Sequence, residues 1–399
     1  MDSNKYICIF GGGAIRGVAY IGAMRALKEL GIKTDTFIGS SVGAIIAAFC
    51  AIGYSSEEVR LILNEFNAFM FKDLNFSIGS DFSFSKGDVF EDWIRDNIEK
   101  KFYGEEYKKG ENPPVIFKNL EKSLYICTTD LRTNSQFIFS KKETPDFEVA
   151  KAVRISAGFP GLMKPVEYEN KFLVDGDLAK SLPLWKFDKD LLNTDNRILE
   201  FRLEGCRDCL NFKNVLEYFN SVYSTISNFS SEQIVETYQD KDNFDYIIID
   251  TKDILLLDFQ MPNEMRDKLA QNGYETTMKY FTETLVKKKR KLLPQYEKTL
   301  NAMLKLKPLI KYGKTDGARR TVLDFICETT SEYNNIDSVF LNDLIKFKAS
   351  FLRDIKDYKF LPLHIIENKI EHTKVLQGLI ERCENTINDL KNYIEKYSE

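Results

Sequence analysis

Histidine and long apolar runs are scarce in this 399-residue chain, and each shortage excludes certain classes of protein. Only two histidines occur, His364 and His372, both in a helical, charged tail. We expect His372 to be solvated there. No apolar run approaches the ~20 residues of a membrane-spanning helix. The first residues lead directly into a strand-like segment, without the flanks of a secretion signal. We therefore expect neither a membrane-spanning nor a secreted protein.

An excess of one charge and a regular set of cysteines are also missing. The 56 basic and 60 acidic side chains leave a net charge of −4, so no overall field attracts nucleic acid. The seven cysteines are scattered and odd in number, which favours reduced thiols over a disulfide framework. Cys206 and Cys209 lack a second cysteine pair or histidines at zinc spacing. We expect a cytoplasmic protein without a metal ion, a cofactor or a nucleic-acid partner.

Strand-like and helical segments alternate over the first part of the chain. Short apolar runs at residues 6–10, 36–38, 124–128, 136–139, 198–203 and 246–249 predict buried strands. A helical pattern covers residues 18–30, and Ser55 with Glu58 forms a capping box that opens a further helix. This alternation predicts a three-layer α/β domain with a mostly parallel central sheet.

The pattern after Pro262 is helical, with strand signals gone and charged residues filling the polar positions. We predict a domain of residues 1–290 followed by a smaller all-helical region of residues 291–399. In that region a four-three apolar alternation predicts a packing seam, made of Leu376, Ile380, Cys383, Ile387, Leu390 and Ile394. The seam is too short for a long coiled coil, so packing within one chain is favoured over dimerisation.

The string Gly39-Ser40-Ser41-Val42-Gly43 is the strongest chemical signal in the chain. Such a string predicts little by itself, but residues 36–38 before it are strand-like and residues 44–48 after it begin a helix. Ser41 therefore falls on a sharp strand-to-helix turn, where Gly39 and Gly43 remove side chains from a crowded backbone. We predict Ser41 to be a nucleophile and Ser40 to serve the turn.

A glycine triplet follows the first predicted strand. Gly11, Gly12 and Gly13 let backbone N–H groups converge on an anion, which can be a phosphate or an oxyanion. Residues 12, 14 and 17 keep the spacing of a dinucleotide-binding loop, so a nucleotide site stays open as an alternative. The acidic residue that such a site needs after the second strand is replaced by Ser41. An oxyanion loop facing Ser41, with Arg16 supporting it, uses both features together.

An activated serine needs a base, and both histidines lie in the tail. A carboxylate is the remaining choice. The apolar run of residues 172–174 ends at Asp175-Gly176-Asp177, which makes Asp175 the candidate. An Asp-Gly pair is commonly only a turn, so this assignment depends on its surroundings.

Five blocks of the chain, taken together, resemble the patatin-like phospholipases. The blocks are the glycine triplet with Arg16, the Ser41 string, residues 127–131, residues 154–160 and Asp175-Gly176, in that order. The resemblance covers residues 5 to 285 and leaves the tail unexplained. It implies a lipid acyl hydrolase with Ser41 as nucleophile, Asp175 as base and the Gly11, Gly12 and Gly13 amides as oxyanion hole.

Two positions depart from the family pattern. Phe10 precedes the triplet where the family often has an acidic or small residue, and Asp177 stands where the family usually has glycine or alanine. A second carboxylate two residues from Asp175 would disfavour the charged form of that base, or would point outward.

Two segments are candidates for lipid contact. Residues 66–84 are rich in phenylalanine and form either a lid over the site or a cap packed on the core. The basic block of residues 287–291 suits anionic headgroups at ~1 kcal/mol per charge, although such runs usually form a solvated helix face. The expected partners are a phospholipid or other acyl-ester lipid, a membrane surface, and a protein or second copy of the chain bound through the C-terminal helices. The alternative function is a catalytically silent lipid-binding or scaffold protein that recruits a partner through this tail.

Overall fold

The structure is a computed structural model of the chain. It describes residues 5–66, 83–178, 197–205, 221, 225, 244–252, 254–256, 258–312, 340–341, 343–347, 349–350 and 362–397. The chain divides into two compact units. Unit 1 holds Met1–Gln239 and Phe244–Met278, and unit 2 holds Asp240–Asn243 and Lys279–Glu399. The expected boundary near residue 290 lies inside a helix of unit 2.

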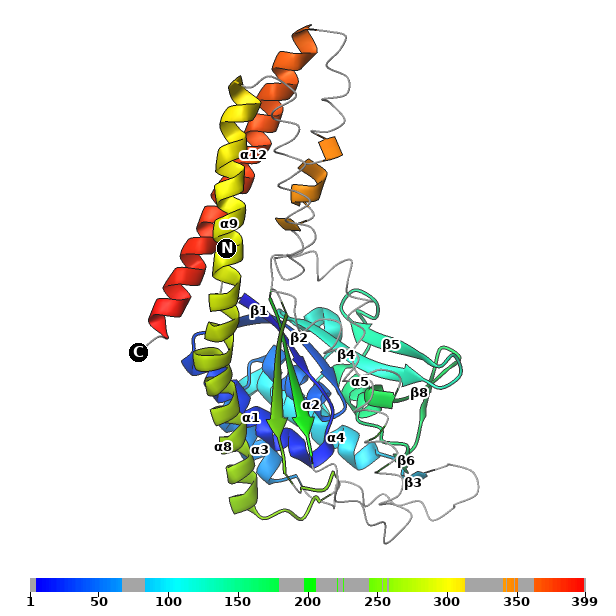
Figure 1. The fold of residues 1–399 in the computed structure, drawn as a ribbon. Helices are drawn as coiled ribbons and strands as arrows, with labels where there is room; N and C mark the ends of the chain where they lie inside the picture. The colour runs from blue at the N-terminus through cyan, green and yellow to red at the C-terminus, as the bar shows by residue number, and fades with distance from the viewer. Residues whose placement is uncertain are drawn as a thin grey trace. The chain divides into compact units, whose positions relative to one another are not determined.

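Unit 1 is built on a mixed, mostly parallel sheet (Figure 1). Its strands run in the order β10-β9-β1-β2-β4-β8-β7, with β5 also paired to β4. The bounds are Lys5–Phe10 for β1, Lys33–Ser40 for β2, Ser123–Asp130 for β4, Ser135–Ser140 for β5, Val166–Tyr168 for β7, Lys171–Asp175 for β8, Arg197–Glu204 for β9 and Phe244–Asp250 for β10. All the predicted strands are present, and the predicted α/β class is confirmed.

The antiparallel part of the sheet gathers at one side. Strands β10, β9, β1, β2 and β4 are parallel to one another, whereas β5 and β8 run antiparallel to β4. A short turn joins β4 to β5, and Asn134 in it has a φ of 50°. A turn this short can only connect antiparallel strands, which explains the local departure from a parallel sheet.

Helices alternate with strands along the chain of unit 1. They are α1 Ala19–Glu29, α2 Val42–Ile52, α3 Ser56–Asn64, α4 Asp88–Tyr103, α5 Val149–Ser156 and α8 Asn263–Lys279, with a 3-10 turn η1 over Ala14–Val18 and a small sheet of β3 Ser83–Ser85 and β6 Gly161–Met163. The predicted capping box is confirmed: Ser55 accepts from the Glu58 N–H, and the Glu58 carboxylate accepts from the Ser55 N–H at 2.8 Å. Helix α2 is almost entirely buried and packs on β1, β2 and β4, which carries Ser41 into the core.

Two glycines let α1 and α8 approach each other closely. A Cβ on Gly273 would stand 2.0 Å from the Ala19 carbonyl oxygen, and a Cβ on Gly22 would stand 1.7 Å from the Ala270 carbonyl oxygen. Both neighbours are backbone atoms that cannot rotate away. The glycines therefore fix the separation of two helices that are far apart in sequence.

Unit 2 is helical in its described part. Helix α9 covers Leu285–Tyr312, preceded by a π-helical turn over Tyr280–Thr284, and α12 covers Pro362–Lys396. The predicted seam residues from Leu376 to Leu390 are buried in a cluster with Leu292, Tyr296 and other apolar residues of α9. Packing of the seam within one chain is therefore confirmed. None of the helices in the described ranges combines the length and apolar character needed to span a bilayer.

The expectation that His372 is solvated is wrong. Its side chain is 4% exposed and its ring lies 6.0 Å from that of Phe347. His372 stands one helical turn before Leu376, so it continues the buried stripe of α12 despite the charged residues around it in sequence. In the basic block of residues 287–291, Lys289 is buried over the ring of Tyr393 at 4.6 Å, while Lys287 and Lys291 are exposed.

Candidate active site

Ser41 stands on a strained turn between β2 and α2. Its φ of 54° and ψ of −127° are unusual for a residue with a side chain, and its side chain is 7% exposed. A Cβ on Gly43 would stand 2.0 Å from the Phe10 carbonyl oxygen, and one on Gly39 would stand 2.3 Å from the Gly43 carbonyl oxygen. Only glycine fits at these two positions. The Ser41 N–H donates to the Ser156 hydroxyl at 3.1 Å, which holds the turn from a second helix.

The Ser41 hydroxyl donates a hydrogen bond to Asp175, which lies 134 positions later in the chain. The distance from Ser41 Oγ to Asp175 Oδ2 is 2.7 Å, and Asp175 is fully buried at the end of β8. The other carboxylate oxygen, Oδ1, accepts from the Asp177 N–H at 2.9 Å. The Asp175 N–H donates to the Gly158 carbonyl at 3.1 Å. The carboxylate is thus fixed on both oxygens, with one of them aimed at Ser41.

The glycine triplet passes directly over Ser41. A Cβ on Gly12 would stand 3.0 Å from the Ser41 Cβ, and Gly13 has a φ of 148°. The Gly11 N–H donates to the Phe201 carbonyl at 3.1 Å, so this amide extends the sheet. The Gly13 N–H has no hydrogen-bond partner among the described residues. The first amide of the triplet is thus used by the sheet and the second by the Asp177 carboxyl.

The remaining residues predicted to support the site also lie at this edge of the sheet. Arg16 Nε donates to the Ile254 carbonyl at 2.7 Å, and its guanidinium packs against the backbone of Gly205. Burial lowers the pKa of Arg16. A Cβ on Gly176 would stand 2.3 Å from the Cys127 carbonyl oxygen, so the residue after Asp175 must be glycine. Arg16 ties the turn after the glycine triplet to the segment at Ile254, and Gly176 lets the end of β8 pack against β4.

A buried charge cluster behind the triplet was not predicted. Asp177, Glu200 and Arg202 are all nearly or fully buried, and Arg202 Nε donates to Glu200 Oε1 at 2.5 Å. Burial raises the pKa of the Asp177 carboxyl, while the charge of Arg202 and a hydrogen bond from the Gly12 amide oppose that shift. Asp177 therefore does not point outward. The signal available in the sequence was the pair Glu200 and Arg202 inside the apolar run of β9.

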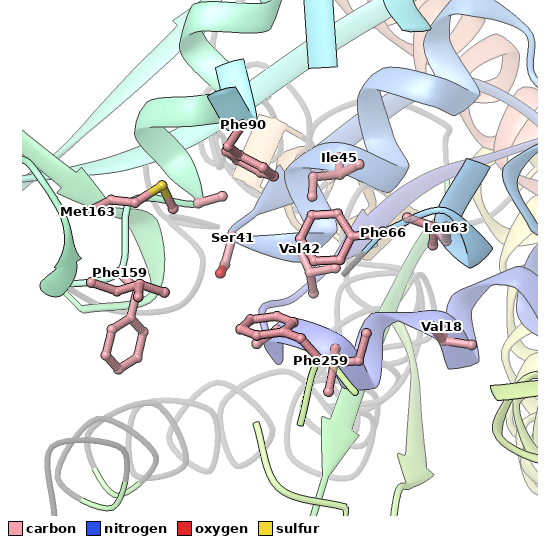
Figure 2. A pocket seen from close by; sticks show the side chains of 14 residues that line it. Val18, Ser41, Val42, Ile45, Leu63, Phe66, Phe90, Phe159, Met163 and Phe259 are labelled. Atoms are coloured by element: carbon pink, nitrogen blue, oxygen red, sulfur yellow. The ribbon is translucent and has the colours of Figure 1, made fainter. Parts of the chain in front are cut away.

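An apolar cavity of about 60 Å³ opens beside the Ser41 hydroxyl (Figure 2). Its described lining is Ala14, Ile15, Val18, Ser41, Val42, Ile45, Leu63, Phe66, Phe90, Ala157, Phe159, Leu162, Met163 and Phe259. Ser41 contributes the hydroxyl, and the other side chains are apolar. A lining of this kind suits an apolar group rather than a charged one.

Several predicted features lie outside the described residues. Phe66 is described and lines the cavity, but residues 67–82 of the phenylalanine-rich stretch are not described. The same holds for Cys206 and Cys209. Within the ranges that the structure describes, no cluster of His, Cys, Asp or Glu side chains is arranged to hold a metal ion.

The arrangement can support attack on an acyl ester: a hydroxyl on a strained turn, a buried carboxylate within hydrogen-bond distance, nearby backbone amides and an apolar cavity. Residues 8–188 match the family model of the patatin-like phospholipases. The chain belongs to the patatin-like phospholipase family. This membership supports hydrolase activity on lipid esters.

Relatives of the chain include bacterial and viral proteins. The chain is 27% identical to an uncharacterised protein, YqhO, of Bacillus subtilis, over 67% of this chain and 95% of the relative. It is 30% identical to an uncharacterised protein of Acanthamoeba polyphaga mimivirus, over 66% of this chain and 90% of the relative. A probable lipid hydrolase of Invertebrate iridescent virus 6 is 28% identical over 44% of this chain and 61% of the relative.

Proposed function

We propose that the protein hydrolyses fatty-acyl esters of lipids, as a phospholipase A or lysophospholipase, through a dyad of Ser41 and Asp175. The observation that carries the proposal is the 2.7 Å hydrogen bond from the Ser41 hydroxyl to the fully buried Asp175 carboxylate. No histidine is needed, because Asp175 Oδ2 is in position to take the proton directly as Oγ attacks the ester carbonyl. The acyl group is transferred to Oγ, and the alcohol leaves with the proton that Asp175 took from Ser41, which restores the carboxylate. Water activated by Asp175 then releases the fatty acid.

Gly12 and Gly13 supply the amides for the oxyanion in this proposal. The Gly11 amide is engaged with Phe201, so its part is to hold the loop against β9. The Gly12 amide also donates to the Asp177 carboxyl, so a developing oxyanion competes with Asp177 for it. Each such donor typically contributes ~10²–10³ to the rate.

The substrate class follows from the cavity. Its described lining is apolar apart from the Ser41 hydroxyl, which suits an acyl chain and excludes a charged headgroup from that side. The headgroup then lies on the outer side of Ser41. The reaction requires no metal or cofactor, because the dyad and the amides supply the base, the nucleophile and the charge stabilisation.

Product analysis by mass spectrometry tests this function. Purified protein is incubated with phospholipid and lysophospholipid vesicles, and fatty acid release is measured for the wild type, Ser41→Ala and Asp175→Asn. Asp130→Asn is the matched control, because Asp130 is a buried aspartate of the adjoining strand whose carboxylate bonds to Thr133 and to the Phe172 N–H.

We expect release by the wild type and by Asp130→Asn, and its loss in both dyad variants. Full activity in Asp175→Asn would show that the dyad is wrong even if the enzyme class is right. Vesicle binding by an inactive wild type that survives Ser41→Ala would instead support the lipid-binding or scaffold alternative.

A further inference from the structure

The cavity beside Ser41 is bounded on one side by two segments that are far apart in sequence. Leu63 lies in the last turn of α3, Phe66 follows that helix, and Phe259 comes from the segment before α8. The rings of Phe66 and Phe259 meet edge to face at 5.6 Å between centroids. Figure 2 shows Phe66, Leu63 and Phe259 on the same side of Ser41. We call these three residues the distal wall.

A single buried arginine ties the two segments together. Arg266 is 4% exposed in the first turn of α8. Its Nη1 donates to the Leu63 carbonyl at 2.5 Å, and its Nη2 donates to the carbonyls of Phe66 at 2.9 Å and Phe259 at 3.3 Å. Its Nε donates to the Met261 carbonyl at 3.1 Å. All three residues of the distal wall are therefore held through their own backbone carbonyls by one guanidinium.

The choice of arginine follows from these acceptors. The last carbonyls of a helix lack intrahelical partners and form its negative end, so α3 favours a cation at this point. The planar guanidinium presents five N–H donors in a fixed fork, which lets it reach carbonyls on two segments at once. Among the described residues, the hydrogen-bond partners of Arg266 are all backbone carbonyls. Burying a guanidinium costs free energy unless its donors are hydrogen-bonded, and here they are. Packing of α8 alone would not need a buried charge at this position.

We propose that Arg266 is a positioning residue that fixes the distal wall and thereby sets the length of acyl chain that the Ser41 site accepts. The proposal rests on the proposed function, because it assigns a specificity device to the same cavity. Arg266 acts through Leu63, Phe66 and Phe259 and does not touch the reacting atoms. With the wall held, a long chain meets the aromatic rings. With the wall released, the rings move and longer chains fit.

A series of p-nitrophenyl esters from acetate to palmitate tests the proposal. The chain-length profile of kcat/KM is measured for the wild type, Phe259→Ala, Arg266→Met and Arg266→Lys. Leu269→Ala is the control for lost stability, because Leu269 is equally buried on the same helix but does not line the cavity. Binding of fatty acids of the same lengths to Ser41→Ala, with and without Arg266→Met, is measured by calorimetry as a readout that does not need turnover.

We expect Phe259→Ala and Arg266→Met to raise the ratio of long-chain to short-chain kcat/KM by about tenfold or more, the scale on which an apolar pocket discriminates a methylene. The change should be larger in KM than in kcat. Arg266→Lys should fall between the wild type and Arg266→Met. Leu269→Ala should lose stability and keep the wild-type profile.

The proposal is overturned if Arg266→Met keeps the wild-type chain-length profile, or if Leu269→Ala shifts the profile as Arg266→Met does. Failure of the proposed function looks different. In that case the wild type hydrolyses no ester, while fatty-acid binding to the cavity still stops at a defined chain length that Arg266→Met extends. Binding without any length limit in either background would remove the inference as well.

Discussion

Replacing Gly12 by alanine is the sharpest perturbation that the site offers. A Cβ at this position would stand 1.8 Å from Asp177 Oδ2, 2.7 Å from Asp177 Cγ and 3.0 Å from the Ser41 Cβ. Real atoms do not approach this closely, so either the Asp177 carboxyl or the glycine loop must move. Asp177 is 1% exposed and lies against Arg202 and the Gly12 amide, which leaves it little room to rotate. We expect the loop to move away from Ser41.

The magnitude follows from the role of the loop. Loss of one oxyanion donor typically lowers kcat by ~10²–10³, which corresponds to ~2.7–4 kcal/mol of transition-state stabilisation. We expect Gly12→Ala to show a loss of this size on a soluble short-chain ester, with residual activity above that of Ser41→Ala. The atoms nearest to the new Cβ belong to Asp177. The double variant Gly12→Ala/Asp177→Ala should therefore be roughly tenfold more active than Gly12→Ala, a gain within the range of interaction energies between residues in contact.

The assay is kcat on a p-nitrophenyl ester for the two single variants and the double variant, with thermal unfolding of each as the control for folding. A Gly12→Ala protein that keeps kcat within about threefold of the wild type would show that the loop does not supply an oxyanion donor, since a lost donor costs far more than this. So would a double variant that is no more active than Gly12→Ala.

Three further predictions concern stability and are measured by denaturant midpoints. Gly273→Ala should lower the free energy of unfolding by ~1–3 kcal/mol, because its Cβ would meet a backbone carbonyl of α1. Gly378→Ala on α12 would meet nothing within 4 Å and should raise the free energy of unfolding by up to ~1 kcal/mol. Equal effects of the two substitutions would contradict this. Burial raises the pKa of Asp177 above its usual value of 3.8, so the contribution of this carboxyl to folding stability is lost as the pH rises above 3.8. The wild type should therefore lose stability relative to Asp177→Asn over this range. Parallel pH profiles of the two proteins would contradict this. Hydrogen bonds from Lys101 and from the capping box lower the pKa of Glu58 to about 2. The wild type should therefore lose its stability advantage over Glu58→Gln as the pH falls from 4.5 to about 2. A constant difference between the two proteins would contradict this.

Local patterns in the sequence predicted much of the fold and the centre of the site. The Ser41 turn could be predicted because a strand, two glycines and a helix lie within a few residues of one another. The capping box of α3 is equally local. Asp175 depended on the family resemblance, because an Asp-Gly pair alone is commonly a turn. The antiparallel run of β5 could not be taken from its apolar content, since that content is the same for either direction.

The parts that were missed depend on contacts between distant segments. Glu200 and Arg202 lie on β9, and the carboxyl near them comes from residue 177. Arg266 bonds to carbonyls about 200 positions earlier in the chain, and no residue near it in sequence indicates this. Such partners become visible only when the sheet and helices are assembled. His372 was misjudged for a related reason, because its neighbours in sequence are charged while its neighbours in space are apolar.

Activation of Ser41 as a nucleophile by Asp175 can be measured as the rate of covalent labelling by a fluorophosphonate probe. Peptide mapping locates the adduct, and Ser40→Ala is the control, since Ser40 is a buried serine next to Ser41. We predict a single adduct on Ser41 in the wild type and in Ser40→Ala, none in Ser41→Ala, and labelling slowed by ~10²–10⁴ in Asp175→Asn. An adduct on Ser40 would show that Ser41 is not the nucleophile, and an Asp175→Asn protein that labels as fast as the wild type would show that Asp175 does not activate it.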